Sequence, residues 1–574
     1  MKHLLKQLKA YRKESILGPL FKLLEAGFEL LVPLLVAAMI DQGVKLGDRS
    51  VIVRMSLMMV GLGLIGLLCS VTAQYFAAKA AVGSTTRLRR ALFAHLQTLS
   101  YTELDTIGAS TMLTRLTSDM NQVQSGVNLT LRLALRSPFV VFGAMVMAFT
   151  IDVRAASVFA IVIPILFAVV FGVMIVCIPL YRKVQARLDR VLGMTRENLT
   201  GVRVLRAFGR EEEQKREFSA RNEALTKEQN HVGRISVLLN PVTYVIINLA
   251  IVALIRTGAL RVESGALSQG DVIALYNYMS QILVELIKLA NLVLNITRAA
   301  ACCNRIGAVL EIESSQHSPQ TEPETLADAP AIEFRRAGLR YAGAGGDALD
   351  GISFRAEKGQ TIGVIGGTGS GKTTLVNLIP RFYDATEGSV LVDGVPVERY
   401  PLESLRRRIG VVPQKAVLFH GTIRENLLWG DPDAGDGTLH EALRAAQAEE
   451  IVQGKEGGLD FEIEQGGRNL SGGQRQRLTI ARALVRKPEI LILDDSASAL
   501  DFATDAALRK ALRALPERPT VVIVSQRTSS IRHADQIIVL DNGRMVGLGT
   551  HEELLRTCEV YREIHESQYK KEER

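Results

Sequence analysis

The hydrophobic positions of this chain follow two different patterns. Long apolar runs occur near 16–41, 52–82, 131–151, 155–181, 239–260 and 270–300. A helix formed by any of these runs is long enough to cross about 30 Å of hydrocarbon. Beyond residue 330, shorter apolar runs alternate with polar segments, as they do in a soluble α/β domain. The pattern predicts a transmembrane domain of six helices over 1–313, followed by an α/β domain over 331–574.

Polar stretches of two kinds separate the apolar runs. The segments at 83–130 and 183–238 are long, charged and helical in pattern, so we expect them to continue the membrane helices into the cytosol. The other connections between spans are short. The stretch 314–330 contains several prolines and has no periodicity, which is typical of a linker between domains.

The distribution of charge predicts how the chain is oriented. Lysine and arginine number 68 against 60 acidic residues, which gives a net charge of +8. The basic residues gather beside the apolar runs, at 2–13, 87–90 and 182–190, as they do in loops retained in the cytosol. We therefore expect a multi-pass plasma-membrane protein with a cytosolic N-terminus and α/β domain, and no nucleic-acid partner. The five cysteines show no metal-ligand or CxxC spacing.

Polar residues interrupt two of the predicted spans. In the sixth, they share one helical face, and they are Asn277, Gln281, Glu285, Lys288, Asn291 and Asn295. Because polar groups are costly in lipid, this face is either a pathway for cargo or a seam between helices in which Glu285 and Lys288 pair. In the first span, Lys22, Glu25 and Glu29 also share a face, which we expect to lie at the membrane interface with extended side chains.

The α/β domain contains a glycine-rich loop that is a candidate binding motif. It follows the β-branched run 361–365, precedes a helical pattern, and consists of Gly366, Gly367, Thr368, Gly369, Ser370, Gly371, Lys372, Thr373 and Thr374. Strand, loop and helix in this order form the context of a phosphate-binding loop. Lys372 would reach the terminal phosphates of a nucleotide, and the hydroxyl of Thr373 would bind Mg²⁺.

Three further residues fit a nucleotide site. Asp494 ends the buried strand 490–494, where its carboxylate can hold the Mg²⁺ shell opposite Thr373. Gln414 could contact the metal and the γ-phosphate. Tyr341 lies shortly before the loop, where it is either an aromatic that stacks on the base or an ordinary strand tyrosine. The sequence therefore predicts a P-loop domain that binds a nucleotide and Mg²⁺.

Between the loop and the acidic strand lies a run that resembles the signature of ATP-binding cassette (ABC) proteins. Its residues are Leu470, Ser471, Gly472, Gly473 and Gln474. Tyr341 is similar to the A-loop of that family, Gln414 to the Q-loop, and Ser498–Asp501 to the D-loop. Six spans before one cassette resemble a half-transporter of the ABC exporters, and Tyr101–Ala109 resembles a coupling helix. The family implies a dimer in which Ser471 to Gln474 and Asp501 act at the ATP sites.

Two positions depart from the family's usual residues. Asp495 stands where the family usually has a glutamate that polarises the attacking water, and Gln526 stands where it usually has a histidine. The resemblance then implies the degenerate-site subunit of a bacterial heterodimeric, multidrug-type exporter of small molecules, lipids or peptides. Its partner half-transporter would carry the glutamate and the histidine. The alternatives are a homodimer with slow ATPase and a regulatory ATP-binding subunit.

Overall fold

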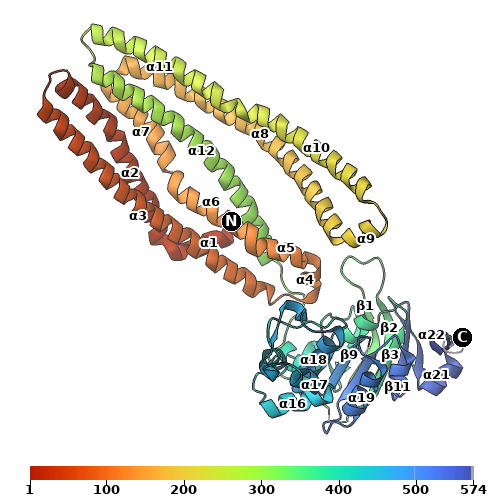
Figure 1. Cartoon of the computed structure of the whole chain (residues 1–574). Helices are drawn as coiled ribbons and strands as arrows, with labels where there is room; N and C mark the ends of the chain where they lie inside the picture. Colours follow the sequence, from red (N-terminus) through yellow and green to blue (C-terminus); the bar gives the residue numbers. More distant parts are fainter. Residues whose placement is uncertain (327, 497, 570–574) are drawn as a thin grey trace. The chain divides into compact units, whose positions relative to one another are not determined.

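The computed structural model describes residues 1–326, 328–496 and 498–569 (Figure 1). The chain divides into two compact units. The first consists of Met1–Gln97 and Ser110–Ile312, and the second of Thr98–Ala109 and Glu313–Arg574. The predicted linker residue 327 and the last five residues of the predicted α/β domain lie outside the described residues. The short segment Thr98–Ala109 belongs to the second unit although long helices of the first flank it in the sequence.

The first unit is entirely helical in the residues described. Its helices are α1 (Lys2–Leu8), η1 (Lys9–Tyr11), α2 (Arg12–Ala38), η2 (Met39–Val44), α3 (Arg49–Leu96), α5 (Ala109–Thr114), η3 (Arg115–Asp119), α6 (Met120–Leu133), α7 (Arg136–Ile151), α8 (Val153–Thr200), α9 (Val202–Ala207), α10 (Glu211–Val237), α11 (Leu239–Glu263) and α12 (Gln269–Leu310). Over the described part of the chain, six helical stretches are long and apolar enough to cross a membrane. The prediction of six apolar helices is confirmed.

The long helices begin at polar residues that cap them. The Asp48 carboxylate accepts hydrogen bonds from backbone N–H groups at the start of α3, and Asp152 does the same for α8. Ser268 and Asp271 form a reciprocal capping box at the start of α12. Asp152 also binds Arg261 of α11 at 2.6 Å. These caps satisfy N–H groups that would otherwise lack a partner where a helix starts.

The second unit contains three sheets in its described residues. Its strands are β1 (Ile332–Leu339), β2 (Leu349–Ala356), β3 (Thr361–Gly366), β4 (Glu387–Val392), β5 (Val395–Pro396), β6 (Ile409–Val412), β7 (Gly421–Thr422), β8 (Glu462–Ile463), β9 (Ile490–Asp494), β10 (Thr520–Val524), β11 (Gln536–Asp541) and β12 (Arg544–Gly549). The central sheet has the order β12-β11-β3-β10-β9-β6, an antiparallel sheet has the order β2-β1-β4-β5, and β7 pairs with β8.

Helices cover and connect these sheets. They are α4 (Tyr101–Ile107), α13 (Lys372–Leu378), α14 (Leu402–Arg408), α15 (Ile423–Leu428), α16 (Asp436–Ala445), α17 (Glu449–Gln453), α18 (Gly472–Val485), α19 (Phe502–Arg513), α20 (Thr528–Ile531), α21 (His551–Thr557) and α22 (Glu559–Tyr569). A mixed α/β cassette with a predominantly parallel central sheet therefore follows the membrane unit, as the sequence predicts.

The register of the central sheet places three loops together. Strands β3, β10 and β9 are parallel, and Val524 of β10 lies opposite both Val364 and Asp494. The carboxyl ends of these strands consequently meet at one edge of the sheet. Ligands of open α/β sheets bind at this kind of edge. The glycine-rich loop, the acidic end of β9 and the segment after β10 all emerge there.

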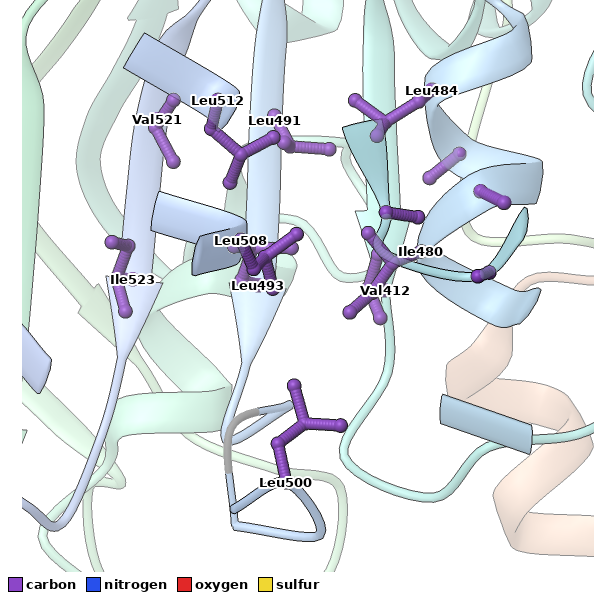
Figure 2. Packing of buried hydrophobic residues seen from close by; sticks show 14 of the residues in the cluster. Val412, Ile480, Leu484, Leu491, Leu493, Leu500, Leu508, Leu512, Val521 and Ile523 are labelled. Atoms are coloured by element: carbon purple, nitrogen blue, oxygen red, sulfur yellow. The ribbon is translucent and has the colours of Figure 1, made fainter. Parts of the chain in front are cut away.

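The core of this unit fixes the positions of those strands. Figure 2 shows Leu493 of β9 beside Leu508 of α19, and Ile480 of α18 against Val412 of β6; all four side chains are buried. Burying a leucine or isoleucine side chain contributes about 1.5–3 kcal/mol. Hydrophobic burial thus packs α19 against β9, the strand that ends in Asp494, and α18 against the neighbouring strand β6.

The predicted linker is attached to the cassette. Its described residues form no helix or strand. Gln316 is buried and donates to the Arg381 carbonyl oxygen at 3.2 Å, and the Leu326 N–H donates to the Asp393 carbonyl oxygen at 3.3 Å. These bonds satisfy backbone and amide groups along the segment. The described residues of 314–330 are therefore an irregular segment that is hydrogen-bonded to the cassette.

Candidate functional site

The glycine-rich loop joins the end of β3 to the start of α13. A Cβ atom on Gly366 would lie 2.2 Å from the Leu540 carbonyl oxygen of β11, so a side chain cannot fit there. Gly371 has a φ of +96°, a left-handed conformation that favours glycine. These two positions require glycine because of a close approach to a strand and because of the turn itself. The backbone is thereby free to curve around a phosphate chain.

Lys372 lies within this loop and is 9% exposed. Its ammonium group donates to the carbonyl oxygens of Gly366 at 2.9 Å and Gly367 at 2.6 Å. Burial lowers the pKa of the ammonium group, while Asp495 and Asp494 act in the opposite direction. A cation with only neutral oxygen partners in its loop can exchange them for phosphate oxygens. Its chemistry fits the role predicted from the motif.

Thr373 and Asp494 face each other across the carboxyl edge of the sheet. The threonine hydroxyl lies 3.1 Å and 3.0 Å from the two oxygens of the carboxylate. Asp494 is 6% exposed, and burial raises the pKa of its carboxyl group. A buried carboxylate with a neutral partner is stabilised by a cation. A hydroxyl and a carboxylate at this separation are an oxygen donor set of the kind that Mg²⁺ uses beside phosphates.

Two polar side chains converge on Asp495, next to the candidate metal pair. Its carboxylate accepts a hydrogen bond from the Gln414 amide at 3.3 Å and from the Gln526 amide at 3.5 Å. Asp495 has a φ of +47°, uncommon for a residue with a side chain. Burial raises the pKa of its carboxyl group, and the Gln414 bond acts in the opposite direction. The carboxylate is thus held between two neutral amides at the edge of the cavity.

These residues line one cavity of about 520 Å³. Tyr341 closes one side: its hydroxyl donates to the Thr374 hydroxyl at 3.0 Å, and its ring lies edge-on to Tyr383 at 5.1 Å. The structure thereby brings together Tyr341, Thr368, Gly369, Gly371, Lys372, Thr373, Thr374, Gln414, Asp494, Asp495 and Gln526. This set combines an aromatic ring, a phosphate-binding loop and a candidate metal pair in a space of nucleotide size.

Several residues that line this cavity were not predicted from the sequence. They are Asp347, Ala348, Val524, Asn542 and Gly543. The Asn-Gly pair forms the turn between β11 and β12, and the Gly543 N–H donates to the Ser370 carbonyl oxygen at 3.3 Å. Asn-Gly between two apolar runs is a hairpin signal that could have marked the turn, although nothing local connects it with the phosphate loop.

The signature residues lie at the start of α18. Ser471 and Gln474 form a capping box, in which the hydroxyl accepts from the Gln474 N–H at 3.2 Å and the amide accepts from the Ser471 N–H at 2.9 Å. Asp501 caps α19 in a similar way. Among the described residues, the lining of the phosphate-loop cavity includes neither the signature nor Asp501. Within one chain, then, the signature does not contribute to this cavity.

The segment Thr98–Ala109 contacts the cassette near the same cavity. The Tyr101 ring lies 4.8 Å from that of Phe382, and the Tyr383 hydroxyl donates to Asp105 at 2.5 Å. Tyr383 also touches Tyr341, as described above. One side chain, that of Tyr383, therefore connects the predicted coupling segment with the residue that would stack on a base.

The residues of the polar stripe of α12 have two kinds of environment: some form a buried ion-pair network, and others are exposed or half-buried. Glu285 is buried and binds Arg136 and Ser137 of α7, and Lys288 donates to it at 2.9 Å. This pairing is the helix seam anticipated as one of two alternatives. Asn291 is exposed and accepts from the Asn295 amide at its backbone carbonyl, whereas Asn277 and Gln281 are half-buried.

The polar face of the first span differs from expectation. Lys22 is 7% exposed and binds Glu25 at 2.5 Å and the Ser70 hydroxyl at 3.1 Å. Glu29 binds Arg136 at 2.6 Å. The prediction of extended side chains at the interface is wrong for Lys22, because partners on its own helix and on α3 neutralise it inside the bundle.

Comparison with known proteins agrees with this architecture. The family model for the ABC transporter transmembrane region matches residues 15–286, and that for the ABC transporter matches residues 349–498. An uncharacterized ABC transporter ATP-binding protein of Mycobacterium tuberculosis (strain H37Rv) is 38% identical over 98% of this chain and 97% of its own length. YfiB of Bacillus subtilis (strain 168) is 36% identical over 100% and 99%, respectively.

Two further proteins extend the comparison. The ATP-dependent lipid A-core flippase of Chromobacterium violaceum is 30% identical over 99% of this chain and 97% of its own length. A solved bacterial Atm1-family ABC exporter with ATP bound shares the fold, with a TM-score of 0.80 at 23% identity, over 97% of this chain and 98% of that one. With a membrane domain of six apolar helices and an ATP-binding cassette in one polypeptide, the chain belongs to the family of ABC transporters.

Proposed function

We propose that this chain is one subunit of a heterodimeric exporter, whose own phosphate-loop site binds ATP and hydrolyses it slowly. The observation that carries this proposal is the cluster of Gln414 and Gln526 around the Asp495 carboxylate. A general base must lie within hydrogen-bond reach of the water it activates. The aspartate is one methylene, about 1.5 Å, shorter than glutamate, and its direct partners here are two amides.

Gln526 weakens the same site in a second way. A glutamine amide can donate a hydrogen bond to a γ-phosphate, but it carries no positive charge. Hydrogen bonds in which the donor or acceptor is ionised are about twice as strong as neutral ones. The site therefore offers less stabilisation to the charge that develops during phosphoryl transfer than a histidine would.

The cavity also contains the residues that we expect to bind the nucleotide. The ring of Tyr341 would stack on a base, and Lys372 would hold the terminal phosphates. Thr373 and Asp494, with Gln414, would hold Mg²⁺, which when bound would neutralise charge on the phosphates. This division between intact binding and weakened turnover suits a site that acts mainly through occupancy.

The signature would serve the second subunit. Ser471 and Gly473 lie at the start of α18, outside the lining of the chain's own cavity in the described residues. We infer that Ser471, Gly472, Gly473 and Gln474 complete the partner's site, with Asp501 beside them. That partner would carry a glutamate and a histidine at the positions of Asp495 and Gln526.

The membrane unit would carry the cargo in an alternating-access cycle driven by the different affinities of two states for ATP. The exposed Asn291 and the half-buried Asn277, Gln281 and Asn295 are our candidates for the pathway, while Glu285 and Lys288 border it from the helix seam. We infer a cytosolic cassette from the placement of basic residues. A lipid is the first cargo class to test, because relatives at 30% and 32% identity are named flippases.

The test compares two variants in the purified heterodimer, with the partner taken from a neighbouring half-transporter gene. Ser471→Ala should remove most of the ATP turnover, because the competent site lies under this chain's signature. Lys372→Ala should weaken nucleotide binding at the slow site and reduce turnover less. Ser471→Thr is the matched control, since it keeps a hydroxyl that can cap α18.

Two results would contradict the proposal. If Lys372→Ala damaged turnover more than Ser471→Ala, the slow and fast sites would be assigned to the wrong subunits. If the chain alone turned over ATP as fast as the heterodimer and exported cargo, it would be a homodimeric exporter. A third result would indicate a regulatory subunit. In that case the chain would bind ATP, but no substitution along the α12 stripe would change the rate of cargo transport or the choice of cargo.

A further inference from the structure

A second, larger cavity lies in the cassette at the opposite edge of the central sheet. It has a volume of about 810 Å³ and is bounded by α19, α20 and the amino ends of β3 and β10. Thr361 is the first residue of β3, and Pro519 immediately precedes β10. The phosphate loop follows the carboxyl end of β3. This cavity is therefore separate from the candidate nucleotide site.

Basic side chains dominate its lining. They are Arg509, Lys510, Arg513, Arg518, Arg532 and His533. The acidic residue in the lining is Asp535, whose carboxylate already accepts a hydrogen bond from the Thr361 N–H at 2.7 Å. Asp505 lies nearby in the core, where it binds Arg509 at 3.0 Å and the Ser530 hydroxyl at 3.1 Å. The cavity thus has a large excess of positive charge.

Some of these cationic side chains have hydrogen-bond partners, and others have N–H groups without a partner among the described residues. Arg513 donates to the His533 carbonyl oxygen at 2.5 Å, and Arg532 donates to the His533 ring at 2.9 Å. The side chains of Lys510 and Arg518 make no hydrogen bond or ion pair with any described residue. Burial lowers the pKa of His533, as do Arg532, Arg513 and Arg509. The imidazole therefore experiences the combined positive field of its neighbours.

We propose that this cavity is a binding site for a multiply charged phosphate compound. Like charges gathered in one concave space repel one another, and low-dielectric walls strengthen their field. A compound with several phosphate groups neutralises them together, and guanidinium groups bind phosphate through paired N–H donors. The volume exceeds that of the candidate nucleotide cavity, so a ligand of nucleotide size fits.

The site is positioned to act on the phosphate-loop edge. Helix α19 starts immediately after Asp501, and α20 starts two residues after Gln526. Arg509 connects the two helices, since it donates to the Ser529 carbonyl oxygen at 3.0 Å. A polyanion bound to cations of both helices holds them together. Its occupancy therefore restrains the two segments that lead into the candidate catalytic edge.

The test uses the full-length protein in detergent, with Lys372→Ala as the background to suppress phosphate binding at the glycine-rich loop. Inorganic tripolyphosphate is titrated by calorimetry without Mg²⁺, and short-chain cardiolipin, a lipid with two phosphate groups, serves as a second probe. Saturable binding is expected. Replacing Lys510, Arg518 and Arg532 together by glutamine should weaken it about tenfold or more, because three cations leave the cavity.

A matched control separates a built site from general charge attraction. Arg399, Arg407 and Arg444 are exposed on the same cassette outside the cavity, and their glutamine triple variant changes the net charge equally. This control should alter the affinity less than twofold. Cavity-dependent binding of tripolyphosphate identifies a soluble ligand, and cavity-dependent binding of the lipid alone identifies a headgroup. If neither probe responds to the cavity variant, or the control has the same effect, the proposal is wrong.

Discussion

Restoring the two unusual residues tests the chemistry of the slow site directly. Asp495→Glu extends the carboxylate by about 1.5 Å, and Gln526→His places a group that can carry charge beside the expected γ-phosphate. In the present structure the Asp495 carboxylate lies 3.3 Å and 3.5 Å from the two amide nitrogens. We expect the double variant to hydrolyse ATP at this site faster than the natural sequence does.

The magnitude follows from the geometry. A displacement of about 1 Å of a reacting group can cost on the order of a hundredfold in rate, or about 2.7 kcal/mol. Exchanging a neutral for a charged donor adds about 1 kcal/mol, or roughly fivefold. Both changes act on one transition state, so their effects need not add. The expected rise is therefore about a hundredfold for the double variant, and smaller for either substitution alone.

The assay measures phosphate release by the heterodimer in which the partner's own catalytic glutamate has been replaced by glutamine. Turnover then reports the site on this chain. Asp495→Asn is the matched control, because it keeps the size of the side chain and removes the base, and it should abolish the residual rate. An unchanged rate in the double variant, with ATP binding intact, would show that these two residues are not sufficient causes. The signature facing this site would then become the suspect.

Two other predictions concern orientation and coupling. The five cysteines are buried, so a membrane-impermeant thiol reagent added outside cells should label Val44→Cys and leave Ser219→Cys unlabelled; the reverse pattern would overturn the topology. Tyr383→Phe removes the hydroxyl that donates to Asp105 at 2.5 Å but keeps the ring beside Tyr341. It should leave ATP affinity unchanged and lower transport severalfold, whereas equal loss of both would contradict a coupling role.

Much of the nucleotide site could be predicted from the sequence because its signals are local. Gly366 and Lys372 belong to one loop whose spacing is set by the backbone that a phosphate chain requires. Asp494 ends an apolar strand, and strands of a parallel sheet end at a shared edge. Asn542 was not predicted, because it reaches the same cavity only through the pairing of β11 with β3, which no local pattern contains.

The contacts inside the membrane unit, in contrast, could not be predicted from local sequence patterns. The sequence did not predict Arg136 as an ion-pair partner, because this residue lies at the start of an otherwise apolar run. Its partner Glu285 lies 149 positions away, and Glu29 lies 107 positions away. A polar stripe indicates that partners must exist, because an unpaired charge in the bundle is costly. Which residues supply them depends on how three helices pack, and the periodicity of a single helix carries no such information.

The same contrast explains how a weakened ATPase site can still serve a transport cycle. In the proposed site, binding and turnover would depend on different atoms: Lys372, Thr373 and Asp494 would hold phosphate and metal, whereas Asp495 and Gln526 would act on the transferring phosphate. A ligand shifts a conformational equilibrium through its different affinity for the two states, whether or not it is hydrolysed. A site that loses the second group of interactions and keeps the first would bind ATP but hydrolyse it slowly, and it would act through its occupancy. The Tyr341–Tyr383–Asp105 contacts connect the expected base site with the segment 98–109, so that occupancy could be transmitted there.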